Sequence, residues 1–212
     1  IKNKKHVVTA NKAVIYHHGD EIFQSAKDNG VRVLIESSVC AGTPIIKMLK
    51  EELVANKVSK ISGMLNGTSN FILSNMEDGG DFDSTLKLAQ EEGYAEPDPT
   101  FDIEGMDAAH KIGILSSLAF GTSLPPSDFH IEGITKIEKS DFHYAMDMGY
   151  TVKHLAVAKL DNGMVELRAH PALINLKSHL ANLKGVRNGM EIDTDLIGKI
   201  HICLLYTSDA AD

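Results

Sequence analysis

Apolar and polar positions alternate in two adjacent segments of the last third of the chain. Residues 152–160 and 164–170 alternate in this way on either side of Asp161-Asn162-Gly163. Because an Asn-Gly pair favours the tight turn of a β-hairpin, we predict two antiparallel strands joined at this point. β-branched content predicts further strands at residues 7–10, 31–36 and 58–65, the first of them buried.

Helical patterns and helix-ending signals fill the segments between these strands. They predict helices at residues 11–29, 44–53, 71–76, 83–92, 107–120 and 140–148. Asn29-Gly30 and Gly121 are predicted C-caps, since glycine adopts the left-handed backbone conformation at little cost. Residues 37–43 form a loop of small residues whose backbone is able to lie close to a ligand or an ion.

The composition limits the classes of function. The 212 residues, 43% of them hydrophobic, suffice for a sizeable core in one domain or two small ones. A net charge of −8 argues against non-specific nucleic-acid binding, and no apolar run approaches the roughly 18 residues of a membrane span. Two cysteines are too few for a disulfide framework, and the ten histidines lack a metal-binding spacing. We therefore expect a soluble, cytoplasmic protein.

The candidate chemistry lies in residues 93–111. Pro97 and Pro99 stiffen a loop that leads into a predicted helix. On that helix Asp107 and Lys111 are four residues apart and share a face. In isolation this spacing predicts an ordinary surface ion pair worth a few tenths of a kcal/mol, roughly.

Three further acids crowd the loop before this pair, namely Glu96, Asp98 and Asp102. A rigid loop that holds carboxylates near a lysine suits a small zwitterion better than solvent. Gly105 and Gly113 support this interpretation, because glycine inside a helix costs roughly 1 kcal/mol. Close approach of another backbone or of a ligand would explain their presence.

The segment from Gly93 to Lys111 reads G-Y-A-E-P-D-P-T-F-D-I-E-G-M-D-A-A-H-K, which resembles the signature of the homoserine dehydrogenase family. The resemblance includes residues 7–12, 35–46 and 63–70 and continues to Asn188. It implies an oxidoreductase that interconverts L-aspartate 4-semialdehyde and L-homoserine with NAD or NADP. This reaction belongs to the biosynthesis of threonine, methionine and isoleucine.

The resemblance also implies catalytic residues. Lys111 matches the proton donor for the developing alkoxide, and Asp107 the residue that orients it and binds the hydroxyl end of the substrate. An ammonium group with a pKa of about 10.4 is a suitable donor at neutral pH. Lys12 matches a lysine that lies between cofactor and substrate in the family. Gly93 matches a position whose backbone contacts the nicotinamide end of the cofactor.

Substrate-binding residues are implied on both sides of this pair. Glu96 matches the partner of the substrate's ammonium group, which Asp102 would assist. Taken alone, Asn66-Gly67-Thr68-Ser69-Asn70 predicts only a capped helix start. The family places this loop beside the substrate, which assigns Gly67 and Thr68 to the binding site.

The loop of small residues resembles a monovalent-cation site of the family. By position, the ion, such as Na⁺, would be bound by the carbonyl oxygens of Glu36, Val39, Ala41 and Thr43. The alternative is a plain strand-to-helix turn without an ion, because many relatives have a glycine-richer run here. Cys40 in this loop is interpreted as a small buried residue, since no histidine-acid pair surrounds it.

The resemblance implies an α/β fold in successive parts. Residues 1–36 would be the C-terminal remnant of a Rossmann-type dinucleotide-binding domain, without the glycine-rich fingerprint. Residues 37–195 would form an α+β substrate and dimerisation domain with a mixed sheet and helices. Residues 196–212 are interpreted as a truncated end, of which 203–212 resemble a translated sequencing adaptor. We expect a homodimer when the protein is complete, and no activity from this chain alone.

Two other hypotheses are open at this point. The first is a non-catalytic small-molecule-binding or dimer-forming module derived from such an enzyme. The second is a different reductase of similar architecture, which is disfavoured because it need not carry both the 93–111 string and the 66–70 segment. In the hairpin, Lys153 and His154 are expected to be structural rather than catalytic.

Overall fold

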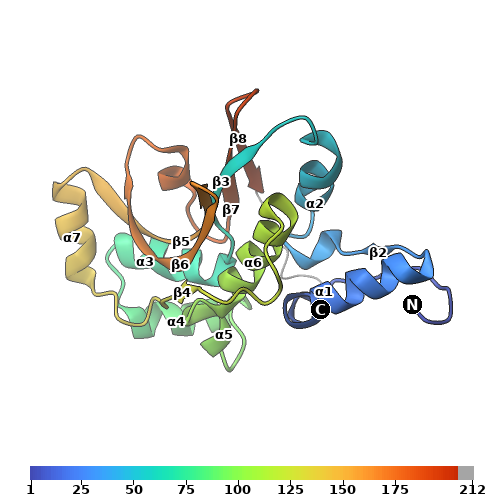
Figure 1. Ribbon diagram of the computed structural model, residues 1–212. Helices are drawn as coiled ribbons and strands as arrows, with labels where there is room; N and C mark the ends of the chain where they lie inside the picture. The colour runs from blue at the N-terminus through green and yellow to red at the C-terminus, as the bar shows by residue number, and fades with distance from the viewer. Residues whose placement is uncertain (205–212) are drawn as a thin grey trace.

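A six-stranded mixed sheet forms the centre of the protein, and the computed structural model describes residues 1–204 (Figure 1). The strand order is β4-β6-β5-β3-β7-β8. The strands are β3 (Val58–Met64), β4 (His130–Ile131), β5 (Tyr150–Asp161), β6 (Met164–Asn175), β7 (Asn188–Thr194) and β8 (Lys199–Leu204). Neighbouring strands are antiparallel except β4 and β6, which are parallel. The mixed sheet is therefore confirmed.

The predicted hairpin is present and is longer than expected. Strands β5 and β6 pair from Tyr150 opposite Asn175 to Asp161 opposite Met164. The two residues between them, at positions 162 and 163, have φ values of 48° and 82°. Positive φ at both positions is what a two-residue turn between twisted strands requires. The Asn-Gly signal therefore predicted the position of the turn between two antiparallel strands.

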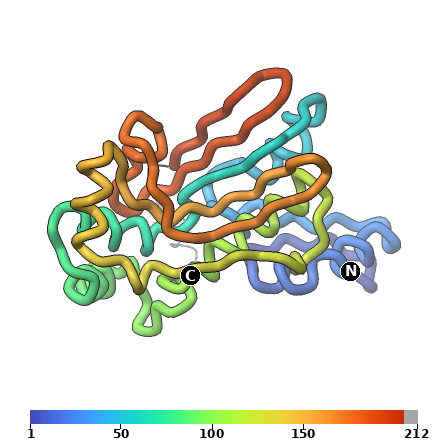
Figure 2. The backbone as a smooth tube through the Cα atoms, turned by 60° about the vertical axis from the view of Figure 1, so that its left-hand side comes forward, coloured from blue at the N-terminus to red at the C-terminus, as the bar shows by residue number. Residues whose placement is uncertain are grey.

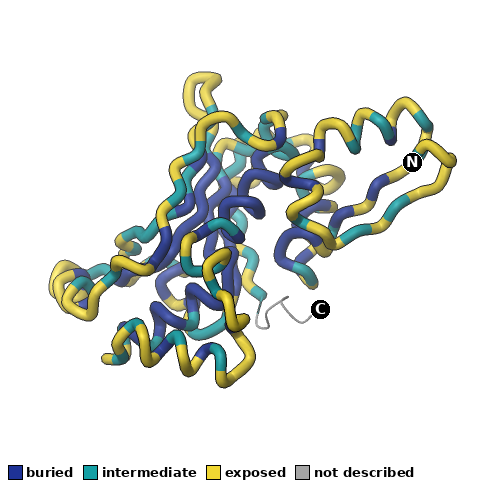
Figure 3. Tube along the Cα trace, turned by 90° about the horizontal axis from the view of Figure 1, so that it is seen from below, coloured by how far each residue is buried: buried dark blue, intermediate teal, exposed yellow. Residues whose placement is uncertain are grey.

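Three helices pack against β5, namely α3 (Gly67–Glu77), α6 (Met106–Phe120) and α7 (Lys139–Asp147). Ala156 and Ala158 of β5 belong to the apolar core that includes α6. The intervening Leu155 and Val157 join a smaller cluster with Leu180, from the 3-10 helix η3 (His179–Asn182), as expected when successive strand residues face opposite sides. Strand β5 and helix α6 are among the most buried elements, and Figure 3 shows buried segments, in dark blue, at the centre of the molecule.

Two helices follow α3 along the chain and lead to the candidate site. They are α4 (Phe82–Glu91) and the short α5 (Thr100–Ile103), which ends just before α6. Within the sheet, β3 pairs with β7 of the β7–β8 hairpin, and the tube in Figure 2 shows these three strands side by side.

The N-terminal segment forms a small separate sheet with one helix. Strands β1 (Val7–Val8) and β2 (Val33–Leu34) are parallel and are joined by α1 (Lys12–Asn29). Asn11 caps α1, since its side chain accepts the Val14 N–H at 3.0 Å. A parallel pair joined by a helix matches the implied Rossmann remnant.

The interface between α1 and α6 depends on Gly113. A Cβ at this position would lie 2.7 Å from the ring of Tyr16 on α1. The prediction that a backbone or ligand approaches Gly113 was therefore wrong, because a side chain fills this space. Gly105 differs: its φ is 83°, and a Cβ there would lie 2.9 Å from His154 Nε2 and 3.2 Å from the Glu132 carbonyl oxygen.

Other predicted elements differ from those observed. The strand at 7–10 is short and Val8 is 80% exposed, because β2 is its one neighbour among the described residues. The strand predicted at 31–36 ends at Leu34, and Glu36 begins the 3-10 helix η1 (Glu36–Ser38). The helix at 44–53 is α2 (Ile45–Lys47) followed by the π-helix η2 (Met48–Glu52).

The helix predicted at 71–76 begins earlier, at Gly67, because the Asn66 side chain caps it. Strands β4, β7 and β8 and helix α5 were not predicted. In β8, Cys203 and Leu204 pair with β7, and these are the first two residues of the segment that resembles an adaptor. The rest of that segment, 205–212, lies outside the described residues.

Candidate active site

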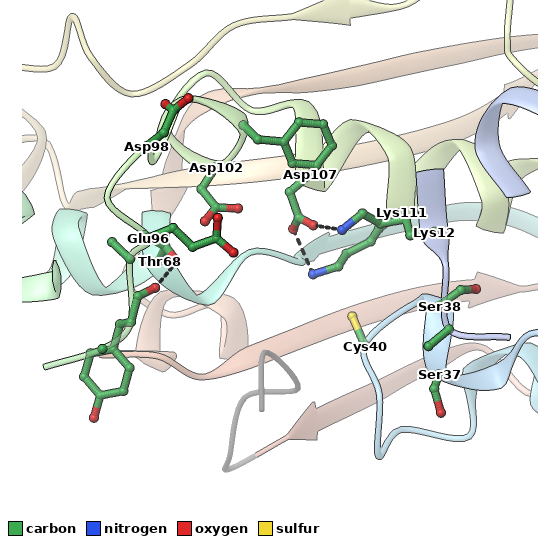
Figure 4. A pocket seen from close by; sticks show the side chains of 15 residues that line it. Lys12, Ser37, Ser38, Cys40, Thr68, Glu96, Asp98, Asp102, Asp107 and Lys111 are labelled. Atoms are coloured by element: carbon green, nitrogen blue, oxygen red, sulfur yellow. Dashed lines mark hydrogen bonds and ion pairs between the residues drawn. The ribbon is translucent and has the colours of Figure 1, made fainter. Parts of the chain in front are cut away.

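A buried carboxylate between two lysines defines the candidate site (Figure 4). Asp107 is the second residue of α6, and its Oδ2 lies 2.8 Å from the Nζ of Lys111 one turn later. Its Oδ1 accepts a hydrogen bond from Lys12, the first residue of α1. Asp107 and Lys111 are each 4% exposed. The predicted i,i+4 pair is therefore buried rather than on the surface.

The charges of this cluster determine the protonation state of the Asp107 carboxyl group. Burial by itself raises the pKa of this carboxyl group, whereas the adjacent Lys111 and Lys12 ammonium groups lower it. The ammonium groups dominate, so the pKa of Asp107 lies well below its usual range and the group stays ionised. Lys111 Nζ also donates to the Leu65 carbonyl oxygen at 2.7 Å, which fixes its position further.

Asn66 links this pair to a second carboxylate, and sequence reasoning did not assign it to the site. Its Nδ2 donates to Asp107 Oδ2 at 2.9 Å and to Asp102 Oδ1 at 2.8 Å. Its Oδ1 accepts the Ser69 N–H at 2.7 Å, as in a helix N-cap. The capping pattern alone explains an asparagine here, so the sequence carried no separate signal for the bridge.

The start of α3 also contacts α5 and the loop that precedes it. Thr68 Oγ1 donates to the Tyr94 carbonyl oxygen at 2.5 Å, and Ser69 Oγ donates to the Asp102 carbonyl oxygen at 3.0 Å. The side chain of Gln90 donates to the carbonyl oxygen of Glu96 at 3.1 Å. These bonds hold the acidic loop against helices α3 and α4.

A cavity of about 380 Å³ brings most of the predicted site residues together. Its lining includes Lys12, Thr68, Gly93, Glu96, Asp98, Asp102, Asp107 and Lys111, together with Ala10, Ser37, Ser38, Cys40, Tyr94, Ala95 and Phe101. In Figure 4, Glu96 and Asp102 lie on the opposite side of the Asp107–lysine cluster from Ser37, Ser38 and Cys40. Gly67 is buried at the first position of α3 and does not line the cavity.

The predicted cation loop lies next to the cavity. The Glu36 carboxylate accepts the N–H groups of Ile46 and Lys47 at 2.8 and 3.0 Å, so it caps α2. The Thr43 carbonyl oxygen accepts the Ile45 N–H at 2.8 Å. None of the four predicted cation-binding residues, which include Val39 and Ala41, lines the cavity. In the described chain no group of three or more His, Cys, Asp or Glu side chains is arranged for a metal.

His110 does not line the cavity and was not predicted. It is 2% exposed, and its ring stacks on Tyr16 at 3.9 Å between centroids and meets Phe101 edge-on at 5.1 Å. Within residues 1–204 neither of its ring nitrogens has a hydrogen-bond partner. Burial first, and then the charges of His17 and Lys12, lower the pKa of His110 to about 4. It is therefore a neutral ring at physiological pH.

The two hairpin residues considered above lie away from the cavity. Lys153 is fully buried and donates to the Leu183 carbonyl oxygen at 3.1 Å. His154 Nε2 lies 2.9 Å from the Glu132 carbonyl oxygen, against Gly105. Both positions agree with the expected structural roles.

Comparison with known proteins identifies the family to which this architecture belongs. The family model of homoserine dehydrogenase matches residues 44–211. The chain belongs to the homoserine dehydrogenase family. Membership rules against a different class of reductase and confirms the resemblance of residues 93–111.

Homoserine dehydrogenases of known sequence and structure align along nearly the whole chain. The chain is 50% identical over 200 residues to the homoserine dehydrogenase of Neisseria gonorrhoeae, covering 94% of this chain and 46% of that protein. It is 49% identical over 199 residues to the homoserine dehydrogenase of Pseudomonas aeruginosa, and the match covers 93% of this chain and 46% of that protein. The chain thus spans about half the length of the curated relatives it matches.

Solved homoserine dehydrogenase structures share the fold. The crystal structure from Thiobacillus denitrificans matches with a TM-score of 0.93 at 46% identity, covering 96% of this chain and 47% of that one. A hyperthermophilic archaeal homoserine dehydrogenase in complex with NADPH matches with a TM-score of 0.82 at 30% identity. This match covers 95% of this chain and 58% of that one. The family uses NAD(P) and acts on small molecules. No helix among the described residues has the length and apolar character to cross a membrane.

Proposed function

We propose that the protein containing this chain interconverts L-aspartate 4-semialdehyde and L-homoserine with NAD or NADP, in the biosynthesis of threonine, methionine and isoleucine. The observation that carries this proposal is the buried Asp107 held between Lys12 and Lys111, in a cavity that Glu96 and Asp102 also line. The substrate has an ammonium group at one end and an aldehyde or hydroxyl group at the other. The Lys12 and Lys111 ammonium groups match the oxygen end, and the Glu96 and Asp102 carboxylates match the ammonium end.

The lysines supply the acid-base chemistry in this proposal. When bound, the nicotinamide nucleotide supplies the hydride for reduction and accepts it in oxidation. Lys111 donates a proton to the substrate oxygen as the alkoxide develops, and Lys12 adds a second positive charge on the cofactor side. Asp107 keeps both ammonium groups in place, because its ionised carboxylate pairs with each. Glu96 and Asp102 bind the substrate ammonium group.

The small residues of the cavity lining fit the nicotinamide end of the cofactor. They are Ala10, Ser37, Ser38 and Gly93, whose small side chains and backbone leave space for a flat ring. The described residues include no glycine-rich turn that would hold a pyrophosphate. Lys12 and Gly93 would accordingly contact the cofactor at its nicotinamide end only.

The finer features of the proposal concern the ion, the assembly and the compartment. The carbonyl oxygens of Glu36, Val39, Ala41 and Thr43 bind a monovalent cation such as Na⁺ in this proposal, with the loop itself held by the Glu36 cap of α2. The protein acts in the cytoplasm as a homodimer. Gly67 and Thr68 contribute to the substrate site through the start of α3.

The test is turnover by the protein containing this chain, measured as NADPH consumption with aspartate semialdehyde and as NADP⁺ reduction with homoserine. Lys111→Ala should lower kcat by on the order of 10²–10⁴ with a smaller effect on KM, because a proton donor acts mainly in the transition state. Lys111→Met, which keeps more of the side-chain volume, should behave in the same way. Lys87→Ala on exposed α4 removes an equal charge and should leave both constants unchanged.

Comparable kcat values for Lys111→Ala and the unsubstituted protein would contradict the assignment of Lys111. Homoserine binding without turnover would instead favour the non-catalytic binding module. These two outcomes are separable, since binding is measured by calorimetry without the nucleotide.

A further inference from the structure

The junction between β3 and α3 holds both charged residues of the α6 pair. Leu65, the first residue after β3, accepts the Lys111 hydrogen bond through its carbonyl oxygen at 2.7 Å. The next residue, Asn66, donates from Nδ2 to Asp107 Oδ2 at 2.9 Å. Two adjacent residues therefore contact both members of a pair that is one helical turn apart.

The hydrogen-bond partners of Asn66 determine the orientation of its amide. Its Oδ1 accepts the backbone N–H of Ser69, so Nδ2 must point to the other side of the group. There Nδ2 uses one hydrogen for Asp102 Oδ1 at 2.8 Å and the other for Asp107 Oδ2 at 2.9 Å. Because Asn66 is only 4% exposed, water has little access to replace these bonds. The amide thus has one orientation that satisfies all its partners.

We infer that Asn66 is a positioning residue of the proposed reaction: its amide fixes the Asp107 carboxylate between the two lysines and holds Asp102 beside it. This inference rests on the proposed function and names a residue that the reaction depends on without touching the substrate. Without the amide, the Asp107 carboxylate is able to rotate about its Cβ–Cγ bond, and the two carboxylates lose the donor group between them. Misplacement of a reacting group by about 1 Å lowers a rate by up to about 10².

Two substitutions test separately the two functions of the Asn66 side chain, namely its hydrogen bonds to Asp102 and Asp107 and its cap of α3. Asn66→Ser keeps an N-cap acceptor for α3 and removes the two donations to the acids, whereas Asn66→Ala removes both. Asn75→Ser is the matched control, because Asn75 lies on the same helix and its side chain donates to the carbonyl oxygen of Phe71 within that helix. All variants are made in the protein containing this chain.

We expect Asn66→Ser to lower kcat by roughly ten- to a hundredfold and to raise KM by a smaller factor, because Glu96 remains to bind the ammonium group. The midpoint of its thermal unfolding should stay within a few degrees of that of the unsubstituted protein. Asn66→Ala should show the same loss of kcat together with a lower unfolding midpoint. Asn75→Ser should leave kcat unchanged.

Asn66→Asp gives a readout that a purely structural role would not move. The new carboxylate keeps the cap but lies beside Asp102 and Asp107, with the Lys12 and Lys111 ammonium groups facing the same cluster. Uptake of one proton by this group of carboxylates restores a donor between them. The activity of Asn66→Asp relative to the unsubstituted protein should therefore rise as the pH is lowered.

The outcomes distinguish this inference from the proposed function. An unsubstituted protein without turnover contradicts the proposed function, whatever Asn66 does. With turnover established, a kcat for Asn66→Ser within twofold of the unsubstituted value overturns the inference. So does a pH-independent activity ratio for Asn66→Asp, which also decides the question if Asn66→Ser fails to fold.

Discussion

The residues of the cavity divide into a fixed group and an adaptable one. Asp107 and Lys111 are buried and bonded to each other, to the end of β3 and to α1. Glu96 is exposed, and its backbone is held by Gln90 from α4. A substitution in the fixed group should affect the reacting end of the substrate. A substitution of Glu96 should affect binding of the ammonium end.

Glu96→Ala should raise KM for homoserine strongly, by on the order of tenfold or more, because loss of an ammonium partner is felt in ground and transition states alike. Steady-state kinetics with homoserine and NADP⁺ measure this change. Glu92→Ala removes the same charge from the exposed end of α4 and should leave KM unchanged. An unaltered KM for Glu96→Ala would transfer the ammonium site to Asp102.

Helices α1 and α6 meet through aromatic rings. His110 of α6 stacks on Tyr16 of α1, and Gly113 gives the Tyr16 ring the space it needs. This contact also places Lys12, at the start of α1, beside Asp107, at the start of α6. The packing of these two helices therefore sets the geometry of the site.

The neutral ring of His110 makes this packing sensitive to acid. Because its pKa of about 4 in the folded protein lies below the ordinary 6.5, the unfolded chain takes up a proton first as the pH falls. The contribution of the neutral His110 ring to the free energy of unfolding is complete above pH 6.5 and is lost as the pH falls from 6.5 to about 4. Allowing for solvent screening, the loss is about 2 kcal/mol.

Urea unfolding of the chain at pH 7 and pH 4.5 measures this loss. His110→Phe, which keeps a ring but cannot titrate, should lose less free energy of unfolding over this range than the unsubstituted chain. His143→Gln is the control, because His143 is an exposed histidine on α7. Equal losses for His110→Phe and the unsubstituted chain would show that His110 does not carry the effect.

Local patterns predicted the elements whose signals lie within a few residues, and long-range contacts escaped them. The Asn162-Gly163 turn and the i,i+4 spacing of Asp107 and Lys111 are local, and the structure contains both. The Lys12–Asp107 pair joins residues 95 apart, so only the fold, or resemblance to a family, brings it to notice. Strand β7 was missed because Glu191 interrupts its apolar pattern. This buried carboxylate pairs with Lys199 and His201 of β8, and the sequence alone does not indicate that contact.

At the scale of the whole molecule, the two sheets differ in size. The six-stranded sheet carries the helices of the site, whereas β1 and β2 form a parallel pair of two residues each. Helices α3, α6 and α7 pack against the large sheet. The cavity is lined both by residues of the N-terminal segment, such as Lys12, and by residues of α3 and α6.

The chain as printed, expressed alone, should show no NAD(P)H-dependent reduction of aspartate semialdehyde. Hydride transfer needs the nicotinamide held about 3–3.5 Å from the reacting carbon, and a glycine-rich turn at a helix N-terminus normally provides that hold. In the described chain α1 begins with Lys12 after an Asn11 cap, without such a turn. Turnover above background, or NADPH binding at micromolar affinity in titration calorimetry, would contradict this expectation.

The position of β3 in the sheet has a consequence for the timing of motions at the cavity. Strand β3 lies between β5 and β7, and its end contacts Lys111 and Asp107 through Leu65 and Asn66. Local opening of a protein costs least at exposed loops and most at interior strands. Lys111 and Asp107 are thus tied to a segment that we expect to open rarely, whereas we expect the exposed loop of Glu96 to open more often. In the proposed reaction, substrate would then enter past Glu96 while the two buried groups keep their geometry.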